Sequence, residues 1–197
     1  MPGKHTAPSA TSSRYSRGMA CVSRQGRDFF LATARLDFGL WQLEDIDLAM
    51  GLWGDPEVAR FIYANGVSPA LVAERLAREI AWQAEHGFQY WPVFLREDGS
   101  HVGCCGLRPY RPDEGIHEFG VHIRPRHWRK GFASEAARAV IAHAFDRLGA
   151  RALFAGHNPQ NGASREMLLG LGFRYTHDEF YPPTGLEHPS YLLTRPS

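Results

Sequence analysis

Hydrophobic residues follow two different spacings along this chain, and the changes between them predict the order of strands and helices. From His117 to Ile123 apolar and polar positions alternate, which places Phe119, Val121 and Ile123 on one face of a predicted strand. Immediately downstream, apolar side chains recur at helical spacing, at Ala137, Val140, Ile141, Ala144, Phe145 and Leu148. The centre of the chain therefore predicts a half-buried strand that leads through a short turn into an amphipathic helix.

The N-terminal half predicts a strand followed by three helices. The first three elements are a strand over residues 29–40, a helix over residues 44–54 and a short helix from about residue 57 to residue 63. The next helix has the clearest limits, because Ser68 is a favourable N-cap, Pro69 suits the first helical position and Gly87 can end the helix. We expect this helix to bury one apolar face.

The C-terminal half alternates strands with helices and turns. Strands are expected over residues 90–95, 102–107, 117–123 and 152–156. A further helix begins near Asn161 and ends at Gly172, and a proline-stiffened loop over residues 179–189 is expected to join the last two strands. This order predicts an α/β fold in which helices flank one mixed sheet.

The turn between the central strand and its helix has the composition of an anion site. It reads Trp-Arg-Lys-Gly-Phe-Ala-Ser-Glu from Trp128 to Glu135, and Arg126, Arg129 and Lys130 add positive charge. Backbone N–H groups converge at a helix N-terminus, where the helix dipole also favours a phosphate or pyrophosphate. We interpret this segment as the seat of a phosphorylated cofactor, although ordinary helix capping would use a similar turn.

Composition and charge limit the classes of protein. The chain has 197 residues, 44% of them hydrophobic, and 22 basic side chains against 21 acidic ones give a net charge of +1. These values predict one globular domain over residues 29–197, preceded by a flexible tail, rich in Ser, Thr and Pro, over residues 1–28. The near-zero net charge argues against a nucleic-acid partner, and no apolar run approaches the length of a membrane span.

The cysteines and histidines predict neither disulfides nor a metal site. Cys104 and Cys105 are adjacent, and with Cys21 they make an odd set, which favours reduced thiols and a cytoplasmic location. The ten histidines lack the spacing of metal ligands. Neither Cys104 nor Cys105 has the His and Asn pattern that accompanies a nucleophilic thiol, so we expect both to be structural.

A second motif follows the strand over residues 152–156. It comprises Asn161, Ser164, Leu168 and the sequence Leu171-Gly172-Phe173. Together the two motifs resemble those of the GNAT superfamily of N-acetyltransferases, and in particular its RimJ/RimL branch, whose first turn reads Tyr-Trp-Gly-Lys-Gly-Tyr-Ala-x-Glu-Ala. The residues that agree with that turn are Trp128, Lys130, Gly131, Phe132, Ala133, Glu135 and Ala136. The resemblance covers roughly residues 32–195, including Asp55-Pro56-Glu57-Val58.

The resemblance implies acetyl-CoA as the cofactor and CoA as the product. In the family the cofactor lies between two parallel strands, which correspond here to residues 117–123 and 153–156. By resemblance, the cofactor-binding residues are Val121, Ile123, Arg129, Lys130, Gly131, Phe132, Ala133, Ser134 and Asn161. Arg129 stands where the family has a glycine, but the backbone N–H that would bind phosphate does not depend on the side chain. Gly120 would let the thioester approach closely.

Glu118 is the candidate catalytic base, because strand alternation places it on the face opposite the apolar stripe. A structural ion pair with an arginine is an alternative role for Glu118, and His122 and His157 are alternative bases. By resemblance, Ser164 faces the sulfur of the cofactor, while Asn161 binds the pantetheine arm or orders the start of the helix. Both residues also suit a helix N-terminus, where Asn is a favourable cap.

The family transfers the acetyl group directly to an amine, without an acyl-enzyme. The implied acceptor is a primary amine, on either a protein N-terminus or a small molecule. Asp178, Glu179 and Glu187 in the last loop would attract such a cation. A non-catalytic acyl-CoA-binding domain of the same fold is the alternative hypothesis. Because dimers are common among relatives, a homodimer is also compatible with the sequence.

Overall fold

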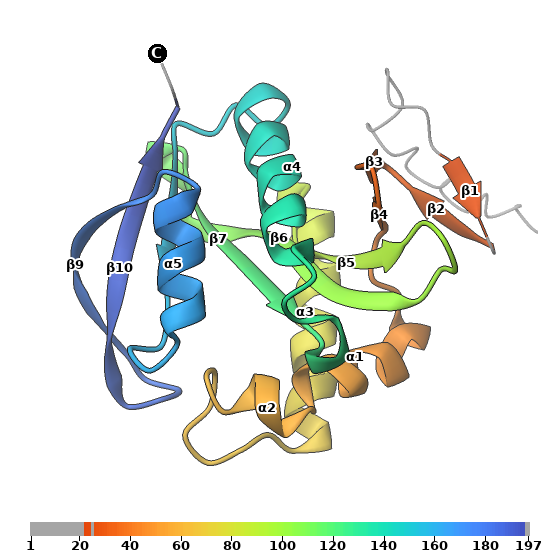
Figure 1. Ribbon diagram of the computed structural model, residues 1–197, viewed down its shortest axis with the longest axis horizontal. Helices are drawn as coiled ribbons and strands as arrows, with labels where there is room; N and C mark the ends of the chain where they lie inside the picture. Colours follow the sequence, from red (N-terminus) through yellow and green to blue (C-terminus); the bar gives the residue numbers. More distant parts are fainter. Residues whose placement is uncertain (1–21, 25, 196–197) are drawn as a thin grey trace, which may run out of the picture.

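The computed structural model describes residues 22–24 and 26–195 (Figure 1). Within this part, β1 (Val22–Arg24) and β2 (Arg27–Phe29) form an antiparallel hairpin. Strand pairing thus begins inside the segment expected to be a tail, residues 1–28. Residues 1–21 and residue 25 of that segment lie outside the described residues.

A mixed sheet of eight strands forms the centre of the molecule (Figure 1). Its strands are β3 (Leu31–Ala32), β4 (Leu36–Phe38), β5 (Tyr90–Leu95), β6 (His101–Arg111), β7 (Ile116–Ile123), β8 (Ala152–Gly156), β9 (Arg174–Tyr181) and β10 (Leu186–Thr194). They lie in the order β3-β4-β5-β6-β7-β8-β10-β9, and among the described strands only β7 and β8 pair in parallel. The predicted fold class, an α/β fold with one mixed sheet, is confirmed.

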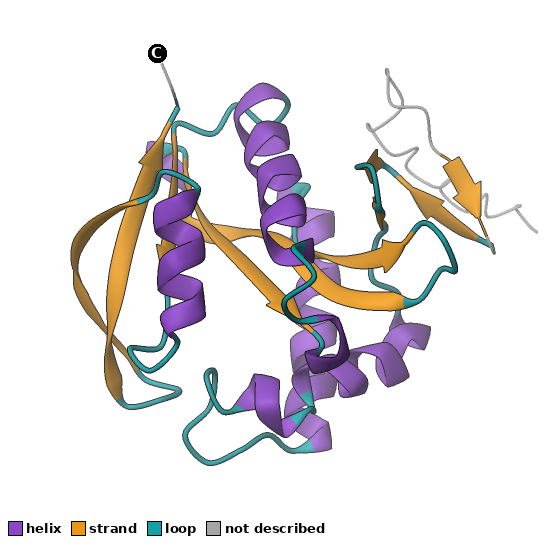
Figure 2. Cartoon of the chain, viewed as in Figure 1, coloured by secondary structure: helices purple, strands orange, loops and turns teal. Residues whose placement is uncertain are grey.

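Helices cover both faces of this sheet. The α-helices are α1 (Ile46–Trp53), α2 (Pro56–Ala59), α3 (Pro69–His86), α4 (Phe132–Asp146) and α5 (Gly162–Gly170), and the short 3-10 turns are η1 (Leu43–Asp45), η2 (Pro112–Glu114) and η3 (Pro125–His127). Figure 2 shows α4 and α5 side by side on one face, with α3 behind the sheet. Since α4 and α5 follow β7 and β8 in the chain, both helices begin near the carboxyl ends of the parallel pair.

Each face of the sheet has its own hydrophobic core. Phe132, Val140 and Leu168 belong to the core under α4 and α5, whereas Trp53 and Leu76 belong to the core under α1 and α3. Burial on both faces explains why β5 and the first part of β6 are buried at nearly every position. Each large apolar side chain that is buried stabilises the fold by about 1.5–3 kcal/mol.

The parallel pair of β7 and β8 separates part-way along its length. Its register ends at the pair Glu118↔Phe154, although β7 continues to Ile123 and β8 continues to Gly156. Their outer edges stay paired, β7 with β6 and β8 with β10. The two strands therefore open into a gap that begins at Glu118.

The limits of α3 agree with those predicted. Ser68 Oγ accepts a hydrogen bond from the Leu71 N–H at 3.2 Å, and Pro69 is the first helical residue. Gly87 ends the helix in the left-handed conformation, with a φ of 82°. The N-cap, the proline and the terminal glycine were therefore sufficient to predict the limits of α3.

The predicted strand over residues 29–40 is wrong as a single element. A tight turn divides it into β3 and β4: Thr33 N donates to Leu36 O at 2.8 Å, and Leu36 N donates to Thr33 Oγ1 at 3.0 Å. The imperfect alternation in this segment reflects the turn, because a hairpin interrupts the period of two.

The predicted loop over residues 179–189 is also largely wrong. Only residues 182–185 form the turn between β9 and β10, and Gly185 has a φ of 69° there. Pro189 lies within β10, opposite Asp178 of the edge strand β9 and next to a bulge at Ser190. A proline is tolerated at such a position because a bulge already interrupts the regular ladder.

Candidate active site

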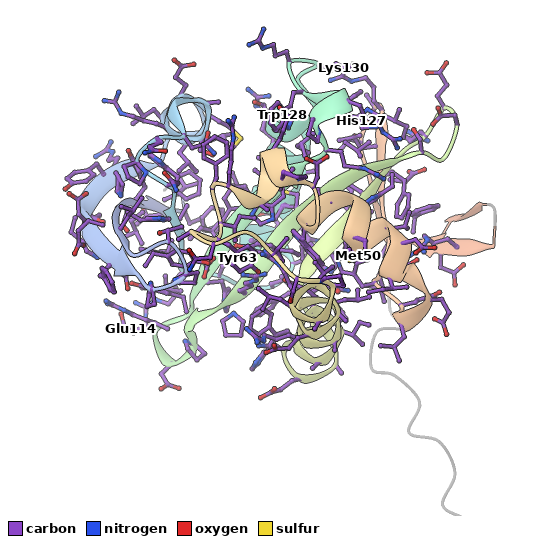
Figure 3. All side chains as sticks on the ribbon, turned by 90° about the horizontal axis from the view of Figure 1, so that it is seen from below. Met50, Tyr63, Glu114, His127, Trp128 and Lys130 are labelled. Atoms are coloured by element: carbon purple, nitrogen blue, oxygen red, sulfur yellow. The ribbon has the colours of Figure 1, made fainter. Side chains whose placement is uncertain are left out.

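A cavity of about 330 Å³ opens where β7 and β8 separate. One side is formed by β7, β8 and α5, and the other by α2, α3 and the β9–β10 hairpin. The loop between α2 and α3 closes this second side, because Ala64 N donates to Pro183 O at 2.9 Å. Figure 3, in which Tyr63 is labelled, shows this loop between α3 and the hairpin.

Glu118 lines the cavity at the point where the gap begins. Tyr90 Oη donates to Glu118 Oε1 at 2.8 Å, and among the described residues Oε2 has no hydrogen-bond partner. No ion pair of Glu118 is present in the described part of the chain: Arg108, opposite Glu118 in the register, pairs instead with Glu79, with Nε 3.1 Å from Oε1. The carboxylate therefore keeps one oxygen available to the cavity.

The two alternative bases are held by other groups. His122 Nδ1 accepts from Trp53 Nε1 at 3.2 Å, and burial, followed by the charges of Arg75 and Arg108, lowers the pKa of His122 well below 6.5. His157 Nδ1 lies 2.8 Å from Asn158 O and its Nε2 lies 3.2 Å from Tyr191 Oη, so both ring nitrogens are used. These contacts favour structural roles for both histidines.

Gly120 lines the cavity and also makes room for a neighbouring aromatic ring. A Cβ at this position would overlap the phenol ring of Tyr90, whose Cε2 would be 2.7 Å away. The absent side chain thus makes room for Tyr90, whose hydroxyl reaches Glu118.

The first turn of α5 reaches the same cavity. Asn161 is the N-cap, and its Oδ1 accepts from Ser164 N at 3.1 Å, as the structural alternative predicted. Ser164 lines the cavity, and its hydroxyl has no hydrogen-bond partner in the described part of the chain. Asn161 is not part of the lining, whereas the neighbouring buried Asn158 is.

The turn before α4 presents unpaired backbone donors. The N–H groups of residues 129–134 donate to no acceptor among the described residues, and Gly131, the N-cap, has no capping side chain. Arg129 and Gly131 adopt the left-handed conformation, with φ values of 58° and 78°. Figure 3 shows Trp128 and Lys130 at this turn. This arrangement can bind an anion.

An interaction distant in sequence holds this turn in place. Glu135 Oε1 accepts from Thr33 Oγ1 at 2.6 Å and from Arg35 N at 3.0 Å, and Arg35 Nε donates to Glu135 Oε2 at 2.6 Å. Arg35 Nη1 also donates to Lys130 O at 3.0 Å. Although burial opposes it, the combined effect of these donors and of the Arg35 charge lowers the pKa of Glu135.

The other predicted site residues are only partly at the cavity. Val121 lines it, whereas Ile123 is buried and its carbonyl accepts from Trp128 Nε1 at 2.6 Å. Of the three acidic residues expected near the acceptor, Glu179 lines the cavity, while Asp178 and Glu187 do not.

Cys104 and Cys105 lie in the sheet, whereas Cys21 lies outside the described residues. Cys104 and Cys105 are fully buried, and burial is the main cause that raises the pKa of Cys104 to about 12. In the part of the chain that the structure describes, no group of His, Cys, Asp and Glu has the arrangement of a metal site. No helix there is long and apolar enough to cross a membrane.

Arg75, Tyr90 and Arg108 are among the cavity residues that were not identified from the sequence. Arg75 lies on α3, and the other two lie on β5 and β6. Each is distant in sequence from Glu118, so no local spacing connects them. The available signal was the presence of Arg75 on an otherwise apolar helix face and of Arg108 in an otherwise apolar strand. A buried charge needs a partner, so each arginine pointed to a contact elsewhere in the chain.

Comparisons with known proteins agree on the family. Residues 35–174 match the family model of an acetyltransferase (GNAT) domain. The uncharacterized N-acetyltransferase p20 of Bacillus licheniformis is 29% identical over 147 residues, which cover 73% of this chain and 82% of that protein. The ribosomal L7/L12 alpha-N-protein acetyltransferase RimL superposes with a TM-score of 0.75 at 12% identity, covering 89% of this chain and 100% of that one. Mycobacterium smegmatis RimJ, in complex with CoA-disulfide, superposes with a TM-score of 0.67 at 17% identity, covering 81% of each chain.

Because the family model spans most of the chain, the protein belongs to the GNAT family of acetyltransferases, which use acetyl-CoA. The likeness to RimL and RimJ is one of fold, since sequence identity is below 20% in both cases.

Proposed function

We propose that this protein is an acetyl-CoA-dependent N-acetyltransferase that transfers the acetyl group directly to a primary amine. The observation that carries the proposal is the position of Glu118. It stands where β7 and β8 separate, Tyr90 orients it, and one carboxylate oxygen is left for an incoming amine. Acetyl-CoA, when bound, supplies the acetyl group as an activated thioester.

The residues present fit a phosphorylated acyl carrier. The unpaired N–H groups of residues 129–134 suit a pyrophosphate, and Lys130 adds positive charge. Beyond Glu118, the edge of β7 that carries Val121 has no strand partner on the β8 side, so its backbone groups are available to an extended amide chain. Asn161 contributes by fixing the start of α5.

Glu118 performs the proton transfer in this proposal. An ammonium group must lose a proton before it can attack a carbonyl, and Glu118 accepts that proton directly or through a water molecule. Burial, followed by the charge of Glu118, raises the pKa of Tyr90 well above 10, so the tyrosine stays protonated and keeps orienting the carboxylate. Ser164, with its hydroxyl unpaired, donates a hydrogen bond to the departing sulfur.

The test is the substitution Glu118→Gln, which keeps the size of the side chain and removes the base. We expect kcat to fall by about 10²–10⁴-fold, the usual contribution of a general base. Binding of acetyl-CoA, measured by titration calorimetry, should not change. Glu187→Gln is the matched control, because Glu187 is exposed and does not line the cavity.

Two outcomes would contradict the proposal. An unchanged rate in Glu118→Gln would exclude Glu118 as the base. A wild-type protein that binds acetyl-CoA but acetylates no peptide N-terminus, amino acid, polyamine or aminoglycoside would instead be a non-catalytic acyl-CoA-binding domain.

A further inference from the structure

Arg75 is a buried cation without an anionic partner. It exposes 7% of its surface, and no Asp or Glu among the described residues lies within ion-pair distance of it. Its guanidinium lies over the ring of Trp53, 4.5 Å from the centroid, and Nη1 donates to Tyr63 Oη at 3.3 Å. A guanidinium has five N–H donors, and this is the single acceptor that the described residues give it.

The two nitrogens that remain unpaired differ in accessibility. Nε is enclosed and has no partner. Nη2 likewise has no acceptor among the described residues, but it is not fully enclosed. Since Arg75 lines the cavity, Nη2 is the group through which a ligand in the cavity would meet this charge.

Arg108, the other arginine that lines the cavity, differs from Arg75 because it has an anionic partner. It pairs with Glu79, which is fully buried, and Glu79 Oε2 accepts from Tyr90 N at 2.8 Å. Glu79 is therefore already neutralised and bonded, and it is not available to Arg75 one helical turn away on α3. The cavity thus contains one cation that the protein neutralises and one that it does not.

Arg75 and Glu118 face the same space. Both line the cavity, and Tyr181 of the β9–β10 hairpin is close enough to both that their charges act on its pKa in opposite directions, after the effect of burial. Aromatic side chains complete this part of the wall, at Phe61, Tyr110, Phe180 and Tyr181. An acceptor held here would meet a carboxylate, a cation and an apolar surface.

We infer that the acetyl acceptor is a small amine that also carries a carboxylate, such as an amino acid, with its amine at Glu118 and its carboxylate at Arg75. This inference rests on the proposed function of the site. A buried arginine is a favourable carboxylate partner, because its planar guanidinium is weakly hydrated and donates in a fixed geometry. A protein N-terminus would bring the amine without a nearby carboxylate, and would leave Arg75 unpaired.

The first test uses the wild-type protein and matched substrates. Initial rates are measured for a series of amino acids in which the amine and carboxylate are separated by carbon chains of increasing length, each compared with its own amide. We expect at least one acid to exceed its amide in kcat/KM by about 10- to 100-fold, the range of a charge-assisted hydrogen bond. The amine of the amide is less basic than that of the acid, so more of it is neutral and able to attack. Amine basicity therefore favours the amide and cannot produce a preference for the acid.

The second test uses Arg75→Gln. We expect kcat/KM for the preferred acid to fall by about 10- to 100-fold, mainly through KM, while the value for the amide stays the same. The KM for acetyl-CoA should also stay the same. Arg78→Gln is the matched control, since Arg78 is on the same helix but exposed and paired with Glu74 at 2.5 Å. If Arg75→Gln does not fold, Tyr63→Phe, which removes one hydrogen bond to Arg75, should reduce the preference for the acid.

The possible outcomes distinguish failure of the inference about the acceptor from failure of the proposed function. Acetylation of the amides or of peptide N-termini at rates equal to or above those of the acids would overturn the inference and leave the proposed function intact. Equal losses for acid and amide in Arg75→Gln would assign Arg75 a structural role, and would also overturn it. Absence of acetylation for every amine, charged or not, would mean that the proposed function itself has failed.

Discussion

At the scale of single residues, Tyr90 connects the packing of the sheet to the proposed chemistry. Its ring occupies the space that a side chain at Gly120 would take, and its hydroxyl donates to Glu118 at 2.8 Å. Trp41 Nε1 donates to the Tyr90 carbonyl at 2.7 Å, which fixes the backbone of the same residue. The orientation of the candidate base therefore depends on a glycine two residues further along its own strand.

Replacement of Gly120 by Ala tests this dependence. The new Cβ should displace Tyr90, with a loss of about 1–3 kcal/mol in the free energy of unfolding and a reduced kcat. Denaturant unfolding and initial rates measure the two effects. Gly170→Ala, in an exposed part of α5 with nothing within 4 Å of the added Cβ, is the control and should gain up to about 1 kcal/mol. Similar behaviour of the two variants would contradict the role of Gly120.

The sequence identified some site residues and missed others for a physical reason. Glu118 was placed correctly because strand alternation is local. The sequence alone could not decide which of Glu118, His122 and His157 is the base. The decision depends on partners that are distant in the chain, such as Trp53 and Tyr191. The contact of Gly120 with Tyr90 could not be predicted for the same reason.

At the scale of elements, the turn before α4 is held from outside its own helix. Glu135, in the first turn of α4, is bonded to Thr33 and Arg35 in the turn between β3 and β4. Arg129, which replaces the usual glycine of the family, adopts a φ of 58°. A left-handed conformation costs a residue with a side chain about 1–2 kcal/mol, so the contacts of Glu135 and Arg35 help to maintain a strained turn.

The contact between Glu135 and Arg35 predicts a dependence of stability on pH. The folded protein lowers the pKa of Glu135 below its usual value of 4.5, so the ionised carboxylate stabilises the fold above that pH. This contribution is lost as the pH falls through the lowered pKa. Glu135→Gln should therefore reduce the free energy of unfolding by about 1–3 kcal/mol at neutral pH.

Thermal unfolding at several pH values tests this dependence. The difference in Tm between wild type and Glu135→Gln should be largest at neutral pH and should shrink once the pH is well below 4.5. Glu166→Gln, at an exposed position on α5, is the control and should show little difference at any pH. A difference that persists unchanged in acid would contradict the assignment.

The predicted elements succeeded where the signals were local. The N-cap, first-turn proline and terminal glycine of α3 fixed its limits, because each acts within one helical turn. The hairpin of β3 and β4 was missed, whereas β9 and β10 were predicted as strands but extend into the residues assigned to the loop between them. Short edge strands and a proline beside a bulge have patterns that resemble one strand and one loop, and pairing with neighbours decides the outcome.

At the scale of the whole molecule, the site has two halves with different origins. The half formed by β7, β8, α4 and α5 is nearly continuous in sequence, and both motifs that carried the family resemblance belong to it. The other half joins the α2–α3 loop to the β9–β10 turn through Ala64 and Pro183, which are far apart in the chain. For this second half the sequence predicted the last loop with Glu179, but not its contact with the α2–α3 loop, because that contact exists only after the sheet has formed.

Binding of acetyl-CoA is tested most directly by the melting temperature of the protein with acetyl-CoA, with CoA and with NADP as a phosphate-bearing control. A ligand at about 100 times its dissociation constant adds about 2.7 kcal/mol to the free energy of unfolding, which corresponds to a shift of several degrees. We expect this shift with both CoA forms and none with NADP. No shift with either CoA form would contradict this binding, and would leave the turn from Trp128 to Glu135 as an ordinary helix start.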